Sequence, residues 1–191
     1  MIPKPLCDNS QRGFFDTTLL NFDEIYGKIV KIAFFEVVMI KIMFVCHGNI
    51  CRSPMAELVL KNMLKEQGIE NMATVCSRAT STEEIGNPVY PPARAELAKH
   101  GISSDGKYSV RLTRADYDNY DLFIGMDSAN IRNMHRMLGG DPDGKIIKFM
   151  TFAGEDRDVA DPWFTGSFDV TYRDVVSGCN KIVEYIKKNQ K

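Results

Sequence analysis

The sequence lacks an excess of charge of either sign. Its 191 residues carry 24 Lys and Arg against 25 Asp and Glu, for a formal net charge of −1. A broad basic surface is therefore missing, and we expect no nucleic-acid partner. A small basic site inside a pocket remains compatible with this balance.

The sequence also lacks a hydrophobic run long enough to cross a bilayer. The most apolar part of the N-terminal region, residues 29–45, is interrupted by Lys31, Glu36 and Lys41, whereas a membrane span needs about 20 consecutive apolar residues. No cationic start is followed by a clean apolar segment and a cleavage site of small residues, which argues against a secretory signal. We therefore expect a cytoplasmic protein that has no membrane partner.

Regular cysteine spacing is missing as well. The cysteines form an odd set of five without a Cys-x-x-Cys pair: Cys7, Cys46, Cys51, Cys76 and Cys179. Such a set does not predict a disulfide framework and fits a reducing compartment. Cys46-His47 with Cys51 has no second ligand cluster beside it, so we expect no metal. Cys76 in a predicted strand and Cys179 on an apolar helix face are expected in the core.

The N-terminal region differs from the rest of the chain in its patterns. Residues 1–39 begin irregularly with Pro3 and Pro5. Apolar residues then recur at helical spacing: Phe22, Ile25, Tyr26, Ile29 and Ala33. An added helix would explain this spacing, but we favour a segment outside the fold, with Met39 as a natural first residue. We expect residues 1–39 to be an N-terminal extension and residues 40–191 to be a single domain.

Strand-like and helix-like runs alternate along residues 40–191. The predicted strands are residues 41–45, 73–77, 121–126 and 145–150, and the predicted helices are residues 55–67, 91–100, 127–138 and a last helix after Gly166. This alternation predicts an α/β fold, a single domain with a four-stranded parallel sheet and helices on both faces. Loops that follow the strands then meet at one edge of the sheet, where ligands bind.

The loop after the first strand carries the chemistry. Five residues separate Cys46 from Arg52, which lets the backbone N–H groups of residues 47–52 curl inward as an anion nest. Gly48 and Asn49 suit the unusual backbone conformations that such a turn needs. The following helix, for which Ser53 is the expected cap and Pro54 suits the first turn, points its positive end at the same place. The sequence therefore predicts a phosphate-binding loop formed by His47, Gly48, Asn49, Ile50, Cys51 and Arg52.

The same loop favours nucleophilic chemistry at Cys46. Inward N–H groups, the helix end and the guanidinium of Arg52 would all stabilise a thiolate, and Ser53 could donate a further hydrogen bond to the sulfur. Arg52 can hold two phosphate oxygens at once. A thiolate next to a bound phosphate is placed for in-line attack on phosphorus.

Asp161 is the candidate proton donor. It follows the fourth predicted strand, so the topology can bring it to the Cys46 loop. A solvated acidic loop is the plainer explanation of Asp161 with its neighbours Asp156 and Asp158, but two aromatic residues, Trp163 and Phe164, follow it. These aromatic residues offer walls for a flat substrate ring, and an acid beside them can donate a proton.

In combination, these motifs resemble those of the low-molecular-weight protein tyrosine phosphatase family. They are the stretch VCHGNICRSPMAE at residues 45–57, Met126-Asp127, and DPWFTG at residues 161–166, and the resemblance extends from about Ile40 to Lys188. It implies a four-stranded parallel sheet flanked by helices and no metal or organic cofactor. It also implies hydrolysis of phosphotyrosine in a protein substrate through a cysteinyl-phosphate intermediate.

The resemblance also implies residue roles. Cys46 would be the nucleophile, Arg52 the phosphate clamp and Asp161 the general acid. Asn49, Ser53 and Ser77 would belong to the hydrogen-bond network that supports the loop. Cys51 would be a redox residue that can form a reversible disulfide with Cys46 under oxidation.

The sequence departs from the family at three places. Many members carry a histidine after the second helix that joins the loop network, whereas residues 104–108 read SDGKY, so we expect a different support for Asn49. Glu83 and Glu84 lie where relatives often place an aromatic residue at the pocket mouth. Residues 1–40 have no counterpart in the usual compact domain.

Three other functions remain as alternatives. A branch of the family that removes phosphate from arginine has a threonine where Ile50 stands, and an isoleucine presents a dry wall suited to an aryl ring, so Ile50 favours phosphotyrosine. A thiol-dependent arsenate reductase would need a close pair of shuttle cysteines, which Cys76 and Cys179 do not form. A phosphoprotein-binding module without turnover is opposed by the intact set of Cys46, Arg52 and Asp161. A monomer and a weak dimer are both compatible with the sequence.

Overall fold

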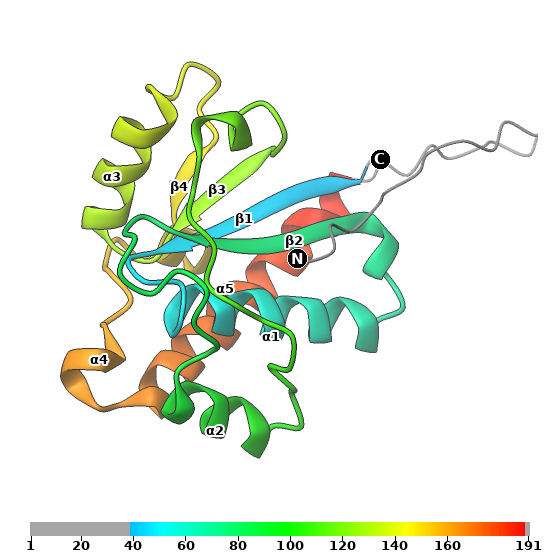
Figure 1. Cartoon of the computed structure of the whole chain (residues 1–191). Coiled ribbons are helices and arrows are strands. Elements are labelled where there is room, and N and C mark those ends of the chain that lie inside the picture. Colours follow the sequence, from blue (N-terminus) through cyan, green and yellow to red (C-terminus); the bar gives the residue numbers. More distant parts are fainter. Residues whose placement is uncertain (1–38, 190–191) are drawn as a thin grey trace, which may run out of the picture. The chain divides into compact units, whose positions relative to one another are not determined.

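The computed structural model describes residues 39–189, which contain a parallel four-stranded sheet (Figure 1). The strands are β1 (Ile40–Cys46), β2 (Ala73–Ala79), β3 (Leu122–Gly125) and β4 (Ile146–Lys148), in the spatial order β2-β1-β3-β4. Strand β1 pairs with β2 on one side and with β3 on the other. Its residues are buried except Lys41, because a central strand of a parallel sheet is covered on both faces.

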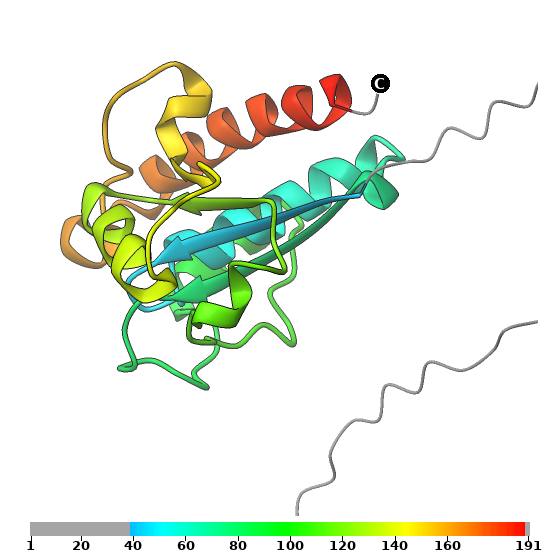
Figure 2. The ribbon, with the colours of Figure 1, turned by 90° about the horizontal axis from the view of Figure 1, so that it is seen from above.

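Helices cover both faces of the sheet (Figure 2). Helices α1 (Arg52–Glu66) and α5 (Phe168–Lys188) pack together on one face, with α2 (Pro91–Lys99) beside them. Helix α3 (Ser128–Leu138) and the 3-10 helix η2 (Arg114–Asp116) pack on the other face. The short elements η1 (Glu70–Met72), η3 (Phe149–Ala153) and α4 (Pro162–Thr165) complete the described residues. The predicted fold class is confirmed.

The side-chain alternation of β1 divides the core in two. Ile42 and Phe44 point into the cluster beneath α1 and α5, while Met43 and Val45 point into the smaller cluster beneath α3, as the two-residue period of a strand requires. Both clusters hold the end of β1 in place. The loop that begins at Cys46 therefore starts from a fixed strand.

Three local predictions differ from the structure. The strand predicted over residues 145–150 ends at Lys148, because Phe149 and Met150 enter η3, where both are fully buried. The residues after Asp161, expected as loop, form one turn of helix, α4, which Asp161 caps by accepting a hydrogen bond from Trp163 N. Ser53 is not the cap of α1: the helix begins at Arg52, no side chain caps it, and the Ser53 hydroxyl has other partners.

Asp127 caps α3, since its Oδ1 accepts a hydrogen bond from Asn130 N at 2.6 Å. The proposed extension, residues 1–39 with Cys7, lies outside the described residues apart from Met39. Within residues 39–189, no helix combines the length and the apolar character that a bilayer crossing demands.

Candidate active site

The loop between β1 and α1 curls around the sulfur of Cys46. Asn49 has a φ of 56°, and among residues 39–189 it is the one residue other than glycine with a positive φ. This left-handed conformation turns the Asn49 N–H toward Cys46 Sγ, at 3.2 Å. Such a conformation is unfavourable for most residues, so other contacts must hold it in place.

Three hydrogen bonds hold the side chain of Asn49. Its Oδ1 accepts from Val110 N at 3.1 Å, and its Nδ2 donates to Ser53 Oγ at 2.8 Å and to Ser77 Oγ at 2.7 Å. Ser53 Oγ in turn lies 3.0 Å from Cys46 Sγ. Asn49, Ser53 and Ser77 are all fully buried. The three residues proposed to support the loop therefore lie in one network that ends at the sulfur.

Arg52 is fixed by groups that follow β3 and β4. Its Nη1 donates to Asp127 Oδ2 at 2.6 Å and to Val159 O at 3.3 Å, and its Nη2 contacts Asp161 Oδ2. Burial opposes the charge of Arg52, but negative charge at Cys46, Asp161 and Asp127 outweighs it and raises the pKa of the guanidinium. The sheet thus brings Cys46, Arg52 and Asp161 together, although they are far apart in the sequence.

A cavity of about 210 Å³ opens above the loop. It is lined by Cys46, His47, Gly48, Ile50, Cys51, Arg52, Glu83, Glu84, Asp161, Trp163 and Phe164. The proposed pocket residues Ile50, Trp163 and Phe164 all belong to this lining. Trp163 leans on Tyr90, with ring centroids 4.9 Å apart, whereas Phe164 is 85% exposed. An apolar wall beside an anion site suits a phosphorylated ring.

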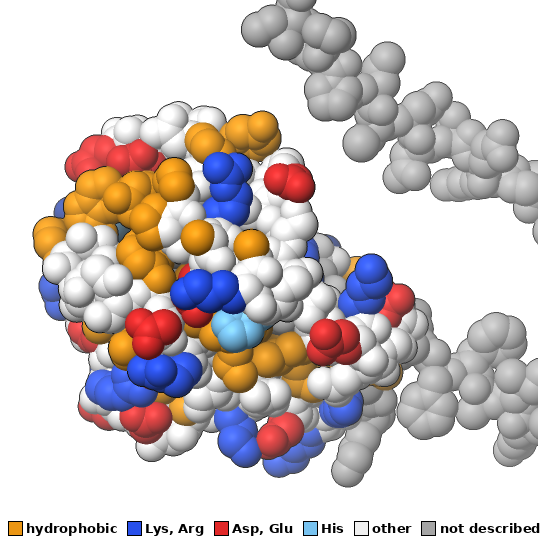
Figure 3. All heavy atoms as spheres, turned by 90° about the horizontal axis from the view of Figure 1, so that it is seen from below, with side chains coloured by type: hydrophobic (Ala, Val, Ile, Leu, Met, Phe, Trp, Pro, Cys, Tyr) orange, Lys and Arg blue, Asp and Glu red, His pale blue; other side chains and the backbone are white. Residues whose placement is uncertain are grey.

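Two glutamates, Glu83 and Glu84, also line the cavity. Glu83 Oε2 lies 3.1 Å from His47 Nε2, and Glu84 Oε2 accepts from Asn87 Nδ2 at 2.7 Å. The side chain of Glu84 also lies against Gly48, where a β-carbon would meet its Cγ at 3.1 Å. Figure 3 shows hydrophobic side chains gathered on the left of the drawn face, the side on which α4 lies in Figure 1, with acidic side chains next to them. The cavity is therefore lined by both apolar and acidic side chains.

Burial raises the pKa of the three described cysteines other than Cys46. Burial, with the charges of Cys46 and Asp161, raises the pKa of Cys51 to about 12. Burial also raises the pKa of Cys76 and of the fully buried Cys179. Cys46 and Cys51 are both free thiols in this structure, so the predicted disulfide between them stays a prediction.

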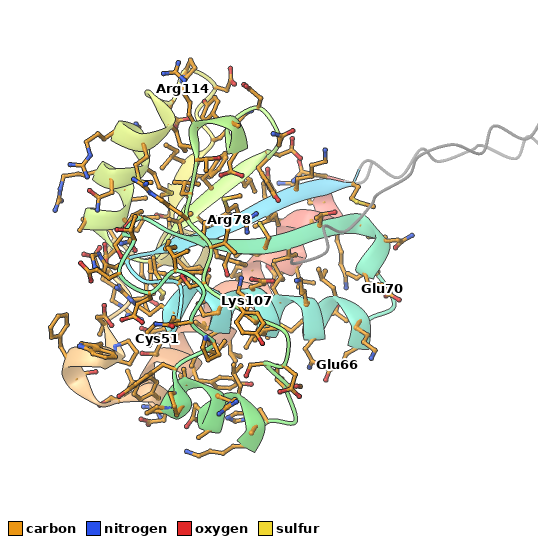
Figure 4. The ribbon with its side chains drawn as sticks, in the orientation of Figure 1. Cys51, Glu66, Glu70, Arg78, Lys107 and Arg114 are labelled. Carbon is orange, nitrogen blue, oxygen red and sulfur yellow. The ribbon has the colours of Figure 1, made fainter. Side chains whose placement is uncertain are left out.

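Glu57 and Lys107 join the network without having been assigned a role from the sequence. Glu57 Oε2 accepts from Ser77 Oγ at 2.6 Å and lies 2.8 Å from Lys107 Nζ. Lys107 belongs to the stretch in which a histidine was missing, and it supports the Asn49 network from there (Figure 4). A glutamate on an otherwise buried helix face, beside Ala56 and Leu60, is the sequence signal that could have pointed to a partner.

Comparisons with known proteins agree on one family. Residues 41–191 match the family described as "Low molecular weight phosphotyrosine protein phosphatase". The low molecular weight protein-tyrosine-phosphatase PtpA of Staphylococcus aureus is 35% identical over 152 residues, which are 79% of this chain and 96% of the relative. Two solved structures extend this similarity to the fold.

The first solved structure is YfkJ from Bacillus subtilis. It is 33% identical with a TM-score of 0.77, and the match covers 80% of this chain and 98% of YfkJ. The second is the low molecular weight protein tyrosine phosphatase SP-PTP from Streptococcus pyogenes. It is 38% identical with a TM-score of 0.69, and the match covers 77% of this chain and 93% of that one.

Proposed function

Because the chain belongs to the low molecular weight phosphotyrosine protein phosphatase family, we propose that it hydrolyses phosphotyrosine in proteins through a cysteinyl-phosphate. The observation that carries the mechanism is the convergence of Cys46 Sγ, the Arg52 guanidinium and the Asp161 carboxyl in one cavity. We propose the cytoplasm as its location, in line with the sequence, and a phosphoprotein as its partner.

Binding would begin with the phosphate in the loop. Inward backbone N–H groups and the N-terminal end of α1 stabilise its oxygens. Arg52, which Asp127 holds in place, can bind two of these oxygens at once. The aryl ring would then lie between Ile50 and Trp163, both of which line the cavity. This arrangement puts the sulfur of Cys46 beneath the phosphorus, opposite the leaving oxygen.

Two steps would follow. In the first, the Cys46 thiolate forms a bond to phosphorus as the bond from phosphorus to the tyrosine oxygen breaks, and that oxygen takes a proton from Asp161. In the second, water attacks phosphorus and gives a proton to Asp161, and the bond from sulfur to phosphorus breaks, which releases phosphate and restores the thiolate. No other co-reactant is needed.

The direct test is hydrolysis of an aryl phosphate and of a phosphotyrosine peptide by the purified chain. Cys46→Ser should abolish turnover because the hydroxyl at this position is a far weaker nucleophile. The exposed helix position Ser177 provides a control substitution, Ser177→Ala, that should leave turnover unchanged. Full activity of Cys46→Ser would contradict the mechanism.

A panel of substrates tests the specificity. Phosphotyrosine peptides should be hydrolysed faster than matched phosphoarginine and phosphoserine peptides, because Ile50 and Trp163 offer apolar contact to an aryl ring. Faster hydrolysis of phosphoarginine would favour an arginine phosphatase of the same fold. Thiol-dependent turnover of arsenate without phosphatase activity would favour a reductase.

A further inference from the structure

We propose that Lys107 is a positioning residue that acts on the nucleophile at a distance: through the carboxylate of Glu57 it holds in place and strengthens the chain of hydrogen bonds through Ser77, Asn49 and Ser53, which ends at the Ser53 hydroxyl that donates to the Cys46 thiolate. The proposal rests on the proposed role of Cys46 as nucleophile. Lys107 itself touches neither the cavity nor the sulfur.

The first step is the buried ion pair. Lys107 Nζ lies 2.8 Å from Glu57 Oε2, and the two side chains are 11% and 6% exposed. Lys107 comes from the loop that crosses in front of α1 and β2, and Glu57 comes from α1 (Figure 4). Lys107 Nζ also donates to the backbone oxygen of Ser77 at 3.4 Å. Removing one partner of a buried pair leaves an uncompensated charge, which is costly.

The second step is the direction of each hydrogen bond. A backbone N–H can only donate, so the Asn49 atom that Val110 N contacts must be the amide oxygen. Both hydrogens of Asn49 Nδ2 then point at hydroxyl oxygens, those of Ser53 and Ser77. Each serine oxygen therefore accepts from Asn49, and its own hydrogen must go elsewhere.

The two remaining hydrogens have one acceptor each. The Ser77 hydroxyl donates to Glu57 Oε2 at 2.6 Å, and the Ser53 hydroxyl donates to Cys46 Sγ at 3.0 Å. Val110 fixes the direction of the bonds from Asn49 to Cys46, while Glu57, by accepting from Ser77, strengthens the bond that Ser77 accepts from Asn49. If Glu57 were protonated, its hydroxyl would compete for the oxygen of Ser77 and leave the Ser77 hydrogen without that acceptor.

The third step compares the two lysines that contact Glu57 and asks which of them keeps its carboxylate ionised, so that it can accept the hydrogen bond from Ser77. Lys107 and Ser77 share Oε2, whereas Lys61 binds the other oxygen, Oε1, at 2.6 Å and is 49% exposed. Burial opposes ionisation of Glu57, but Lys107, ahead of Lys61 and Ser77, outweighs it and lowers the pKa of the carboxyl. Solvent screens the charge of Lys61 far more than that of Lys107.

Few groups face Glu57 and Cys46, the two ends of this chain of hydrogen bonds. Lys61 on α1, Lys107 in its loop, and Ser77 and Cys76 on β2 face Glu57. Cys51, Arg52, Asp161 and Ser53 face Cys46. Lys107→Met removes one of the groups that face Glu57 and leaves the groups that face Cys46 unchanged.

The test measures alkylation of Cys46 by iodoacetamide as a function of pH, with the modified peptide identified by mass spectrometry. Lys107→Met should raise the pH at which half of Cys46 is reactive by about one unit, the size expected for weakening one hydrogen bond to a charged group. Lys61→Met, the matched control on the same carboxylate, should change it by less than about 0.3 unit. Affinity for inorganic phosphate, which Arg52 and the loop bind, should stay within about twofold of the unmodified chain in both variants.

A double variant distinguishes an effect on the hydrogen bonds between Glu57 and Cys46 from a loss of folding. Glu57→Gln combined with Lys107→Met removes both charges but keeps an amide oxygen that can accept from Ser77, so it should restore the alkylation profile. If Lys107→Met fails to fold, Ser77→Ala, which breaks the same chain beyond the ion pair, should produce the same shift.

The proposal is overturned by an unshifted profile for Lys107→Met, by an equal shift for Lys61→Met, or by a double variant that folds but is not restored. Where Lys107→Met does not fold, an unshifted Ser77→Ala profile overturns it. The alkylation needs no substrate, so a failure of the chain to hydrolyse phosphotyrosine would refute the proposed function without affecting this result.

Discussion

Asn49 combines a backbone conformation that costs energy with a side chain that offsets this cost. Its positive φ aims one N–H at Cys46 Sγ, and three side-chain hydrogen bonds tie it to Ser53, Ser77 and Val110. Strain of this kind persists only where the surroundings determine the conformation. The two contributions of Asn49 can be separated by substitution.

Asn49→Ala should lower both stability and activity, because it keeps the strained φ and loses all three side-chain bonds. We expect the free energy of unfolding to fall by about 2–3 kcal/mol, measured by urea denaturation. Asn49→Gly relieves the strain but also loses the bonds, so it should be more stable than Asn49→Ala while its activity is equally low. Equal stability of the two variants would show that the φ of 56° carries no strain.

Asp161→Asn should slow catalysis without unfolding the site, because an amide oxygen can still accept the hydrogen bond from Trp163 N that caps α4. Loss of a general acid costs about 10²- to 10⁴-fold. The loss should be large for phenyl phosphate and small for p-nitrophenyl phosphate, whose leaving group needs little protonation. The same loss for both substrates would remove Asp161 from the role of proton donor.

At the scale of elements, η3 and α5 meet at a point where no side chain fits on the helix. Gly178 of α5 is buried, and a β-carbon at this position would overlap the ring of Phe149. The spacing of apolar residues in α5 predicted that one face of the helix is apolar. It did not predict the close approach of Gly178 to Phe149. It could not do so because Phe149 was expected in a strand and lies instead in η3.

Gly178→Ala should therefore destabilise the chain, although alanine favours a helix. Overpacking costs about 1–3 kcal/mol, against a gain of at most about 1 kcal/mol from helix propensity. Thermal melting should show a lower Tm for Gly178→Ala and an unchanged or higher Tm for Ser177→Ala, the exposed neighbour on the same helix. Adding Phe149→Leu to Gly178→Ala should recover part of the loss, and a failure to recover any of it would exclude the clash as the cause.

The connection from α3 to β4 makes the stability depend on pH. Asp141 accepts hydrogen bonds from Tyr117 OH and from the backbone N–H groups of Lys145 and Ile146. Burial opposes ionisation, but these bonds outweigh it and lower the pKa of Asp141 below the ordinary value of an aspartate. The stabilisation is therefore complete above the pKa of the unfolded chain and is lost as the pH falls through the lowered pKa of the folded state.

Asp141→Asn should remove this dependence. Urea denaturation between about pH 3 and pH 6 should give a stability difference from the unmodified chain that is largest at the upper end and shrinks as the pH falls. Asp118→Asn, at an exposed position, should show a difference that does not vary with pH. A difference that grows toward low pH would give the opposite sign and exclude the lowered pKa of Asp141.

At the scale of the molecule, the sequence predicts local patterns and the residues that the sheet topology brings to one edge, but it misses the contact between Glu57 and Lys107. The alternation of strands and helices and the loop from Cys46 to Arg52 were readable because each is local. The ion pair of Glu57 with Lys107 was not, because it joins α1 to a loop beyond α2. Spacing gave no sign that these two charges share a buried space.

A chain that begins at Met39 should fold and keep its phosphatase activity, because the family match begins at residue 41 and the sheet begins with β1 at Ile40. The measurement is kcat/KM on an aryl phosphate together with the Tm, compared with those of the full chain. Loss of soluble folding in the shortened chain would show that residues 1–38 belong to the domain.

The contact of Arg52 with Asp161 has a further consequence for the cycle. Asp127 and Asp161 both pair with the guanidinium of Arg52. Under the proposed mechanism, the phosphate would therefore compete with the proposed general acid for the same guanidinium. A phosphate bound to Arg52 would release Asp161 from this ion pair, and the freed carboxylate, once it takes a proton from water, would be available as the acid for the leaving oxygen.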